Sequence, residues 1–187
     1  VWKNIMNLRL HIPGKIWWIN NFLDHNTYKT IHDSIIKDRN KIKLHSTEKS
    51  WHKFLYENIQ PPLKSDIMLN KPLTYKPFQK LLTLVKHNPF FKPTDVKKNN
   101  FVIHYMKKGA GINWHDDSNW KYGITYYVNK RWSRQWGGEL MFSHEEGSGY
   151  IPIVGNSLLI VRSPIQHKVV PVVTDIMPRI SVQIFMR

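Results

Sequence analysis

The chain has 187 residues, no cysteine and a formal net charge of +15 at pH 7. Its length favours one domain, residues 1–187, with a proper core. The lack of cysteine excludes disulfides, cysteine-ligated zinc, iron–sulfur clusters and cysteine nucleophiles. No apolar run approaches a membrane span, and polar side chains interrupt residues 1–20 where a signal peptide would be apolar. We therefore expect a cytoplasmic protein that does not use a membrane as partner.

The positive charge has two explanations that the sequence leaves open. An anionic partner, either nucleic acid or an acidic protein surface, would account for it. Base composition would account for it as well, because lysine outnumbers arginine and both asparagine and isoleucine are plentiful, as in proteins of AT-rich genomes. Recognition of phosphates and bases favours arginine. We therefore prefer the compositional explanation and treat nucleic acid as the less favoured partner.

The first half of the chain predicts one strand and two helices. Residues 15–23 have the composition of a short strand, and residues 24–39 show apolar side chains at helical spacing with Asp24 as N-cap. Residues 40–75 are interrupted by prolines and are expected to be irregular. Residues 77–87 predict a second helix with a proline in its first turn. We expect this half, residues 1–99, to support the second half and to border the substrate.

From residue 100 onward the pattern changes to short strands. Phe101, Ile103 and Tyr105 alternate in FVIHYM, which places them on one face, and we expect that face to border the functional pocket, with His104 pointing away. Further strand-like segments are GITYYVN, GGELMFS, NSLLIVR and the C-terminal RISVQIFMR. Helices followed by about seven or eight strands predict an α+β, mainly β fold: a helix-backed β-barrel or jelly roll at residues 100–187.

His115, Asp117 and His167 are the candidate metal ligands. His115 and Asp117 lie two residues apart in INWHDDSNW, so both would reach one ion from the same face of a strand, whereas Asp116 would point away. His167 follows in SPIQHKVV, after room for several strands. Two neutral imidazoles and one carboxylate leave the remaining positions of the metal open. This set suits non-haem Fe(II) that binds both a cosubstrate and O2.

Arg179 is the candidate anchor for an anionic cosubstrate. It alternates with the apolar residues of the last strand, and a buried arginine needs a carboxylate partner, from the protein or from a bound dicarboxylate. Ser181 shares its face and would add a hydroxyl group. Tyr105 and Tyr127 are candidate phenolic donors to the same cosubstrate. Tyr126 replaces Tyr127 if the parity of that strand is shifted by one.

Two further features invite alternative interpretations. The segment KRWSRQW, residues 130–136, combines cations with two tryptophans. It would form a substrate-side lip, a stacking patch for nucleic acid, or a solvated loop whose rings pack on the body of the protein; we prefer the last. His144 lies in SHEEG and is expected in a solvated turn, not in a metal site.

These residues resemble the Fe(II)- and 2-oxoglutarate-dependent dioxygenases, and within them the catalytic domain of prolyl 4-hydroxylases, including hypoxia-factor-type and microbial members. The likeness covers residues 101–187 in the segments FVIHYMKKGAGINWHDD, ITYYVNKRW, GGELMF, GNSLLIVRSPIQHKVVPV and PRISVQIFMR. The opening WWINNFLDHNTYKTIHDSI also resembles the strand and helix that begin such catalytic domains, whereas residues 40–98 show no likeness. The resemblance implies a double-stranded β-helix. It also implies that the predicted triad holds Fe(II) and that Arg179 binds the distal carboxylate of 2-oxoglutarate, helped by Tyr127 and Tyr105.

The resemblance further implies hydroxylation of a prolyl residue in a peptide or protein. O2 would be consumed, succinate and CO2 released, and ascorbate would serve as reductant. Two alternatives stay open. One is an oxygenase or demethylase of the same superfamily that acts on nucleic acid, which the charge would favour. The other is a non-catalytic binding module that kept the barrel, against which the intact triad and Arg179 argue.

Overall fold

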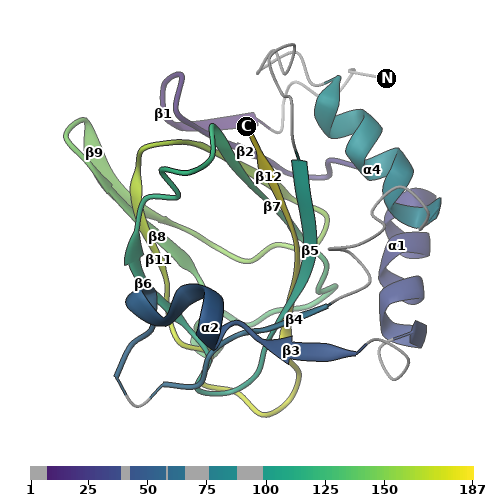
Figure 1. Cartoon of the computed structure of the whole chain (residues 1–187). Coiled ribbons are helices and arrows are strands. Elements are labelled where there is room, and N and C mark those ends of the chain that lie inside the picture. The colour runs from purple at the N-terminus through teal and green to yellow at the C-terminus, as the bar shows by residue number, and fades with distance from the viewer. Residues whose placement is uncertain (1–7, 39–42, 58, 66–75, 88–98) are drawn as a thin grey trace.

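The structure, a computed structural model, describes residues 8–38, 43–57, 59–65, 76–87 and 99–187. Within these residues two antiparallel sheets face each other around a common interior, and two of the helices lie outside the larger sheet (Figure 1). The prediction of a mainly β, jelly-roll core is confirmed by this arrangement. None of the described helices is both long and apolar enough to cross a membrane.

The larger sheet has eight strands among the described residues, in the order β1-β2-β10-β7-β12-β5-β4-β3. Their bounds are β1 Leu8–Ile12, β2 Ile16–Ile19, β3 Leu44–Ser46, β4 Leu63–Ser65, β5 Asn99–Met106, β7 Tyr122–Tyr127, β10 Leu158–Arg162 and β12 Arg179–Met186. The smaller sheet has four described strands in the order β6-β11-β8-β9. Their bounds are β6 Ile112–His115, β8 Leu140–His144, β9 Gly147–Ile151 and β11 Gln166–Val169.

The described helical elements are α1 His25–Asp38, α2 Glu48–Trp51, η2 His52–Phe54, α4 Lys76–Lys86 and η4 Arg134–Trp136. The Asp24 carboxylate accepts a hydrogen bond from the backbone N–H of Thr27 at 2.9 Å, so it caps α1 as its residue type predicts. α1 and α4 lie beside each other outside the larger sheet, whereas α2 lies at one end of the space between the sheets (Figure 1).

Strand β12 shows how the larger sheet separates two environments. Its side chains alternate between the faces, as in any strand. Ile180, Val182 and Ile184 belong to the apolar cluster on the outer face. Arg179 and Gln183, with Phe185, line the cavity on the inner face. The sequence-based assignment of this alternation, including the placing of Arg179 and Ser181 on one face, agrees with the structure.

The outer face of the larger sheet packs against α1 and α4. Phe78 of α4 and Phe101 of β5 meet edge to face, with 5.4 Å between ring centroids. Ile31 and Ile35 of α1 belong to the same buried cluster as the outward residues of β5, β7 and β12. The helical periodicity of α1 and α4 and the strand alternation of the sheet thus supply one continuous core.

In β5 the structure reverses the faces that we expected from the sequence. Tyr105 pairs with Ile180 of β12 and lies in the outer apolar cluster, with Phe101 and Ile103. His104 faces inward and lines the cavity. The expectation that Tyr105 reaches the cosubstrate and that His104 points away is therefore wrong.

The segment at residues 40–75 contains more regular structure than its prolines suggested. Its described part forms β3 and β4, which pair with each other, and β4 pairs with β5 at the edge of the larger sheet. Along the chain, the α2 helix and the η2 turn come between these two strands. Residues 39–42, 58 and 66–75 lie outside the described part of this segment.

Candidate metal and cosubstrate site

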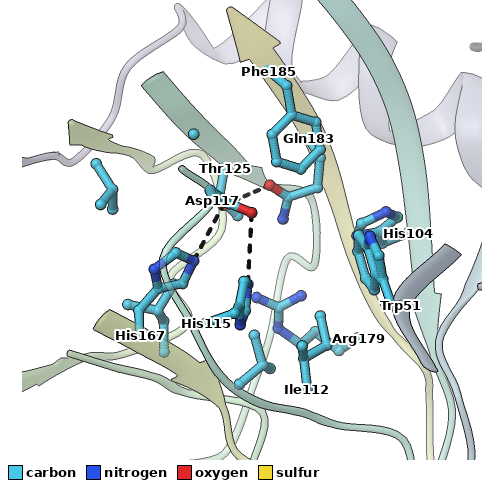
Figure 2. A pocket seen from close by; sticks show the side chains of 14 residues that line it. Trp51, His104, Ile112, His115, Asp117, Thr125, His167, Arg179, Gln183 and Phe185 are labelled. Carbon is cyan, nitrogen blue, oxygen red and sulfur yellow. Dashed lines mark hydrogen bonds and ion pairs between the residues drawn. The ribbon is translucent and has the colours of Figure 1, made fainter. Parts of the chain in front are cut away.

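A narrow cavity lies between the two sheets (Figure 2). Its walls come from both sheets and from α2. The lining residues are Trp51, His104, Ile112, His115, Asp117, Gly123, Thr125, Leu140, Val161, His167, Val169, Arg179, Gln183 and Phe185. Its polar lining includes the two histidines and the carboxylate of the candidate metal ligands, and Arg179.

His115, Asp117 and His167 converge at this cavity from two neighbouring strands and the loop after β6. His115 and His167 are directly paired between β6 and β11, with ring centroids 4.2 Å apart. The Asp117 carboxylate lies 3.8 Å from His115 Nε2 through one oxygen and 3.4 Å from His167 Nε2 through the other. One ligand atom from each residue lies within 4.8 Å of the other two, which is close enough for all three to reach a single ion.

Asp117 reaches the cavity by a different route from the one that strand alternation suggests. β6 ends at His115, and Asp117 adopts a left-handed backbone with φ of 51°. Asp116 is engaged in a turn, where its carboxylate accepts the backbone N–H of Ser118 at 2.9 Å. Gly123 of β7 leaves room for Asp117, because a Cβ atom at that position would lie 3.0 Å from Asp117 Oδ2.

Backbone carbonyls set the orientation of both imidazoles. His115 Nδ1 lies 2.8 Å from the carbonyl oxygen of Asn113, and His167 Nδ1 lies 2.8 Å from that of Ile165. A carbonyl oxygen only accepts, so each Nδ1 carries the proton. In each neutral ring the lone pair is then on Nε2, which faces Asp117. This is the protonation pattern that a metal-binding histidine needs.

The electrostatics of the three residues also suit a cation. Burial would raise the pKa of Asp117, but the hydrogen bond and the charge of His167 outweigh it, so the pKa is lowered and the carboxylate is ionised near neutral pH. Burial lowers the pKa of His115, helped by the neighbouring His167. Burial would also lower the pKa of His167, but the Asp117 carboxylate raises it. Metal binding would require the protonated form of His167 to give up its Nε2 proton.

Arg179 is fully buried, at 0% exposure, and forms no ion pair with an acid of the described residues. Its Nη1 donates to Ser181 Oγ at 3.0 Å and approaches the Met106 sulfur at 3.6 Å. Its Nε and Nη2 have no hydrogen-bond partner within the described part of the chain. Burial lowers the pKa of Arg179, which reflects the cost of holding this charge away from water. Two unused donors on a buried guanidinium fit the two oxygens of a carboxylate.

Tyr127 lies beside this arginine, with the guanidinium carbon 5.2 Å from the ring centroid. Its hydroxyl is buried and makes no hydrogen bond of good geometry among the described residues. Burial raises the pKa of Tyr127, and the nearby Arg179 partly offsets that rise. Tyr126 faces the other side of the sheet, where its hydroxyl donates to Asn156 Oδ1 at 3.0 Å. The structure thus brings Tyr127, and not Tyr126, to the Arg179 side of the sheet.

Several residues of the site were not predicted from the sequence. Thr125 Oγ1 donates to Gln183 Oε1 at 2.9 Å across β7 and β12 (Figure 2), and Gln183 was within reach of the alternation argument because it follows Arg179 by four. Trp51 and Phe54 come from the segment that the resemblance leaves out, and the Phe54 ring lies 5.5 Å from the His115 ring. No sequence signal placed these two at the site.

The 130–136 segment does not present its tryptophans as a stacking surface. Trp132 and Trp136 pack edge to face at 5.3 Å, and Trp132 Nε1 donates to the carbonyl of Gly137 at 2.9 Å. Trp132 also packs against two buried clusters, as the loop interpretation expects. His144 lies at the end of β8, where its Nε2 is 2.9 Å from Lys15 Nζ. That lysine disfavours a cation at His144.

Comparisons with known proteins agree with the fold described above. Residues 101–187 match the model of a family described as the 2OG-Fe(II) oxygenase superfamily. A search of curated protein sequences found no match. Among solved structures, a Pseudomonas putida prolyl-4-hydroxylase is 15% identical with a TM-score of 0.67, over 92% of this chain and 92% of that one.

Two other solved structures show the range of activities on this fold. A Trichoplax adhaerens prolyl hydroxylase, in complex with a hypoxia inducible factor oxygen degradation domain peptide fragment, is 16% identical with a TM-score of 0.76, over 93% of this chain and 84% of that one. The non-heme alpha ketoglutarate dependent epimerase SnoN, from nogalamycin biosynthesis, is 7% identical with a TM-score of 0.69, over 92% and 77%. At these identities the likeness concerns the fold.

Proposed function

We propose that this chain, whose residues 101–187 match the model of the 2OG-Fe(II) oxygenase superfamily, is an oxygenase of that superfamily and hydroxylates a prolyl residue in a peptide or protein. The reaction would consume O2 and 2-oxoglutarate and release succinate and CO2. One observation carries the cosubstrate assignment: Arg179 is buried without an acidic partner among the described residues and faces the same cavity as the three candidate ligands. A dicarboxylate that bridges the metal and this arginine would satisfy both.

His115, Asp117 and His167 would hold Fe(II), since they offer two Nε2 lone pairs and one ionised carboxylate at mutually compatible distances. Bound iron supplies the oxidising chemistry, together with O2 and 2-oxoglutarate. The role of the chain is to keep these groups aligned. The carbonyls of Asn113 and Ile165 fix the two rings.

The cosubstrate pocket would be completed by Arg179 with Ser181 and Tyr127. Ser181 holds one nitrogen of the guanidinium, which leaves the other two donors free for the distal carboxylate. The Tyr127 hydroxyl supplies a further donor beside it. Apolar side chains from the opposite sheet, including Leu140 and Val169, line the same cavity. They exclude water and thereby strengthen each of these polar contacts.

The prolyl substrate is proposed from the structural neighbours that are prolyl hydroxylases, one of which holds a peptide. The test is succinate release with Fe(II), 2-oxoglutarate and ascorbate, the reductant we propose, in the presence of a panel of proline-containing peptides. The His115→Ala protein serves as the blank. We expect stimulation by at least one peptide and a product heavier by one oxygen atom. Succinate release that no proline peptide stimulates would contradict the prolyl assignment.

A second candidate substrate is methylated nucleic acid, which the net charge of +15 favours. The same assay with methylated single-stranded DNA separates the two. Binding to a phosphate backbone through many lysines would weaken steeply as the salt concentration rises. Stimulation by the oligonucleotide alone, with this salt dependence, would replace the prolyl proposal.

A further inference from the structure

His104 is a buried polar side chain that the proposed function has not used. It is 1% exposed and lines the cavity from the inner face of β5. Its Nδ1 is buried and has no hydrogen-bond partner within the described residues. A buried nitrogen without a partner is costly, and in a cavity that binds a ligand the ligand is the natural source of that partner.

The position of His104 relates it to the arginine end of the cavity. It is the cross-strand partner of Ser181, whose hydroxyl accepts a hydrogen bond from Arg179. It lies two residues before Met106, whose sulfur also contacts the guanidinium, so both project from the inner face of β5. The imidazole and the guanidinium therefore border the same part of the cavity.

Trp51 holds the ring of His104 in place. The two rings meet at 85° with 4.9 Å between centroids, and Trp51 lines the same cavity. Trp51 also packs against the small buried cluster that contains Met106 and Ile112. It ends α2, which lies outside the residues that match the oxygenase family. The segment with α2 thus contacts the arginine end of the cavity through the Trp51–His104 ring pair.

We propose that His104 donates a hydrogen bond to the distal carboxylate of the cosubstrate, beside Arg179, and that Trp51 positions its ring for that bond. This inference rests on the proposed function. It makes His104 a cosubstrate-selecting residue and Trp51 a positioning residue.

The charge state of His104 agrees with this role. Burial lowers the pKa of His104 to about 3, with a further contribution from the charge of Arg179. The ring is therefore neutral near pH 7 and carries one N–H, on either nitrogen. It adds a donor for a carboxylate oxygen without placing a second buried cation next to the guanidinium.

The experiment compares two probes that differ in length. 2-Oxoglutarate carries a metal-chelating end and a distal carboxylate, whereas oxalate has only the chelating end. Binding of each to Mn(II)-loaded protein is measured by calorimetry for the wild type, His104→Leu and His104→Asn. We expect His104→Leu to weaken 2-oxoglutarate binding about tenfold and to leave oxalate binding unchanged, because one hydrogen bond to a charged group is lost. His104→Asn keeps a donor near the Nδ1 position and should stay within about threefold of the wild type.

Each other outcome has a defined meaning. Unchanged 2-oxoglutarate binding in His104→Leu would overturn the inference, and equal weakening of both probes would overturn it too, since the residue would then act on the metal end. Failure of the wild type to bind 2-oxoglutarate would instead contradict the proposed function. His25→Leu, an exposed histidine of α1, is the matched control and should behave as the wild type.

Trp51 is tested in the same assay together with a melting curve. Trp51→Ala should weaken 2-oxoglutarate binding several-fold with no change in oxalate binding, whereas Trp51→Phe, which keeps a ring against His104, should restore most of the affinity. A purely structural role would instead lower the melting temperature and weaken both probes together. That result would remove Trp51 from the inference. The Trp51 pair also keeps the inference testable if His104→Leu fails to fold.

Discussion

The two faces of the larger sheet differ in the side chains that they carry, although both are formed by the same strands. On the outer face, the residues of β12 and β7 join α1 and α4 in a continuous apolar cluster. On the inner face, β7 presents Thr125 to the cavity, and β12 presents Arg179 and Gln183, both of which donate to the Ser181 hydroxyl. The outer face stabilises the fold through burial. The inner face keeps buried donors without partners among the described residues, which lowers stability and leaves those donors available to a ligand.

The largest effect on stability should come from the outer face. Phe78→Ala removes a fully buried ring that packs on Phe101, and we expect unfolding to become easier by about 3–5 kcal/mol. Chemical denaturation measures this change. The molecules that remain folded should bind 2-oxoglutarate with wild-type affinity, because Phe78 does not line the cavity. A selective loss of 2-oxoglutarate affinity would contradict the separate roles of the two faces.

Arg179→Met tests the inner face with the opposite expectation. 2-Oxoglutarate affinity should fall about hundredfold, since a charge-assisted, two-donor contact is lost. The ligand-free protein should be as stable as the wild type or more stable by about 1–3 kcal/mol, because a buried charge without an acidic partner among the described residues is replaced by an apolar chain of similar length. Calorimetry measures the 2-oxoglutarate affinity, and chemical denaturation measures the stability of the ligand-free protein. A large loss of stability in the ligand-free state would mean that Arg179 is a structural residue.

Gly123→Ala tests how closely β7 approaches the candidate ligand Asp117. The added methyl group would lie 3.0 Å from Asp117 Oδ2, so the carboxylate must shift by a few tenths of an ångström. We expect metal affinity to fall about tenfold, with little change in folding. Competition with a metal chelator of known affinity measures this. A variant that binds metal as tightly as the wild type would show that the carboxylate has room to move.

The smallest effect should come from Asp24→Ala, far from the inner face. The Asp24 carboxylate accepts the backbone N–H of Thr27 at 2.9 Å and the Thr27 hydroxyl at 2.6 Å. Loss of this helix cap should destabilise the fold by about 1 kcal/mol. Binding of metal and 2-oxoglutarate should not change. A loss of binding in this variant would show that α1 influences the cavity, and would contradict the separate roles of the two faces.

The metal and cosubstrate residues were accessible from the sequence because their chemistry is unusual for their strands. An arginine that alternates with isoleucine and valine, as Arg179 does, needs an explanation beyond packing. His115, Asp117 and His167 converge as predicted, although Asp117 does so through a left-handed backbone beyond the end of β6. Their roles as ligands stay predictions until metal binding is measured.

Which face of β5 borders the cavity could not be predicted from the sequence in the same way. Its residues 101–106 are all buried, since one face meets the outer core and the other meets the interior. When both faces of a strand are buried, the alternation that identifies the core side disappears. For this reason the sequence favours Tyr105 on the side of the cavity and His104 on the other side, and the structure has the reverse.

The structure of the segment with α2 could not be predicted from the sequence, for another reason. β3 and β4 have three residues each, and their place is decided by pairing with β5, which is distant in the sequence. Such short strands carry too little periodicity to be recognised. Trp51 and Phe54 are therefore placed at the site by the pairing of β3 with β4 and of β4 with β5, which no local sequence pattern predicts.

The most direct test of the central claim is an anaerobic titration of the protein with Fe(II) and 2-oxoglutarate, followed by visible absorption. A chelate of the two gives a metal-to-ligand charge-transfer band that neither gives alone. We predict a saturable band in the wild type that is lost in His167→Ala and that requires much more 2-oxoglutarate in Arg179→Met. No band in the folded wild type, or a band that survives His167→Ala unchanged, would contradict the assignment of this cavity.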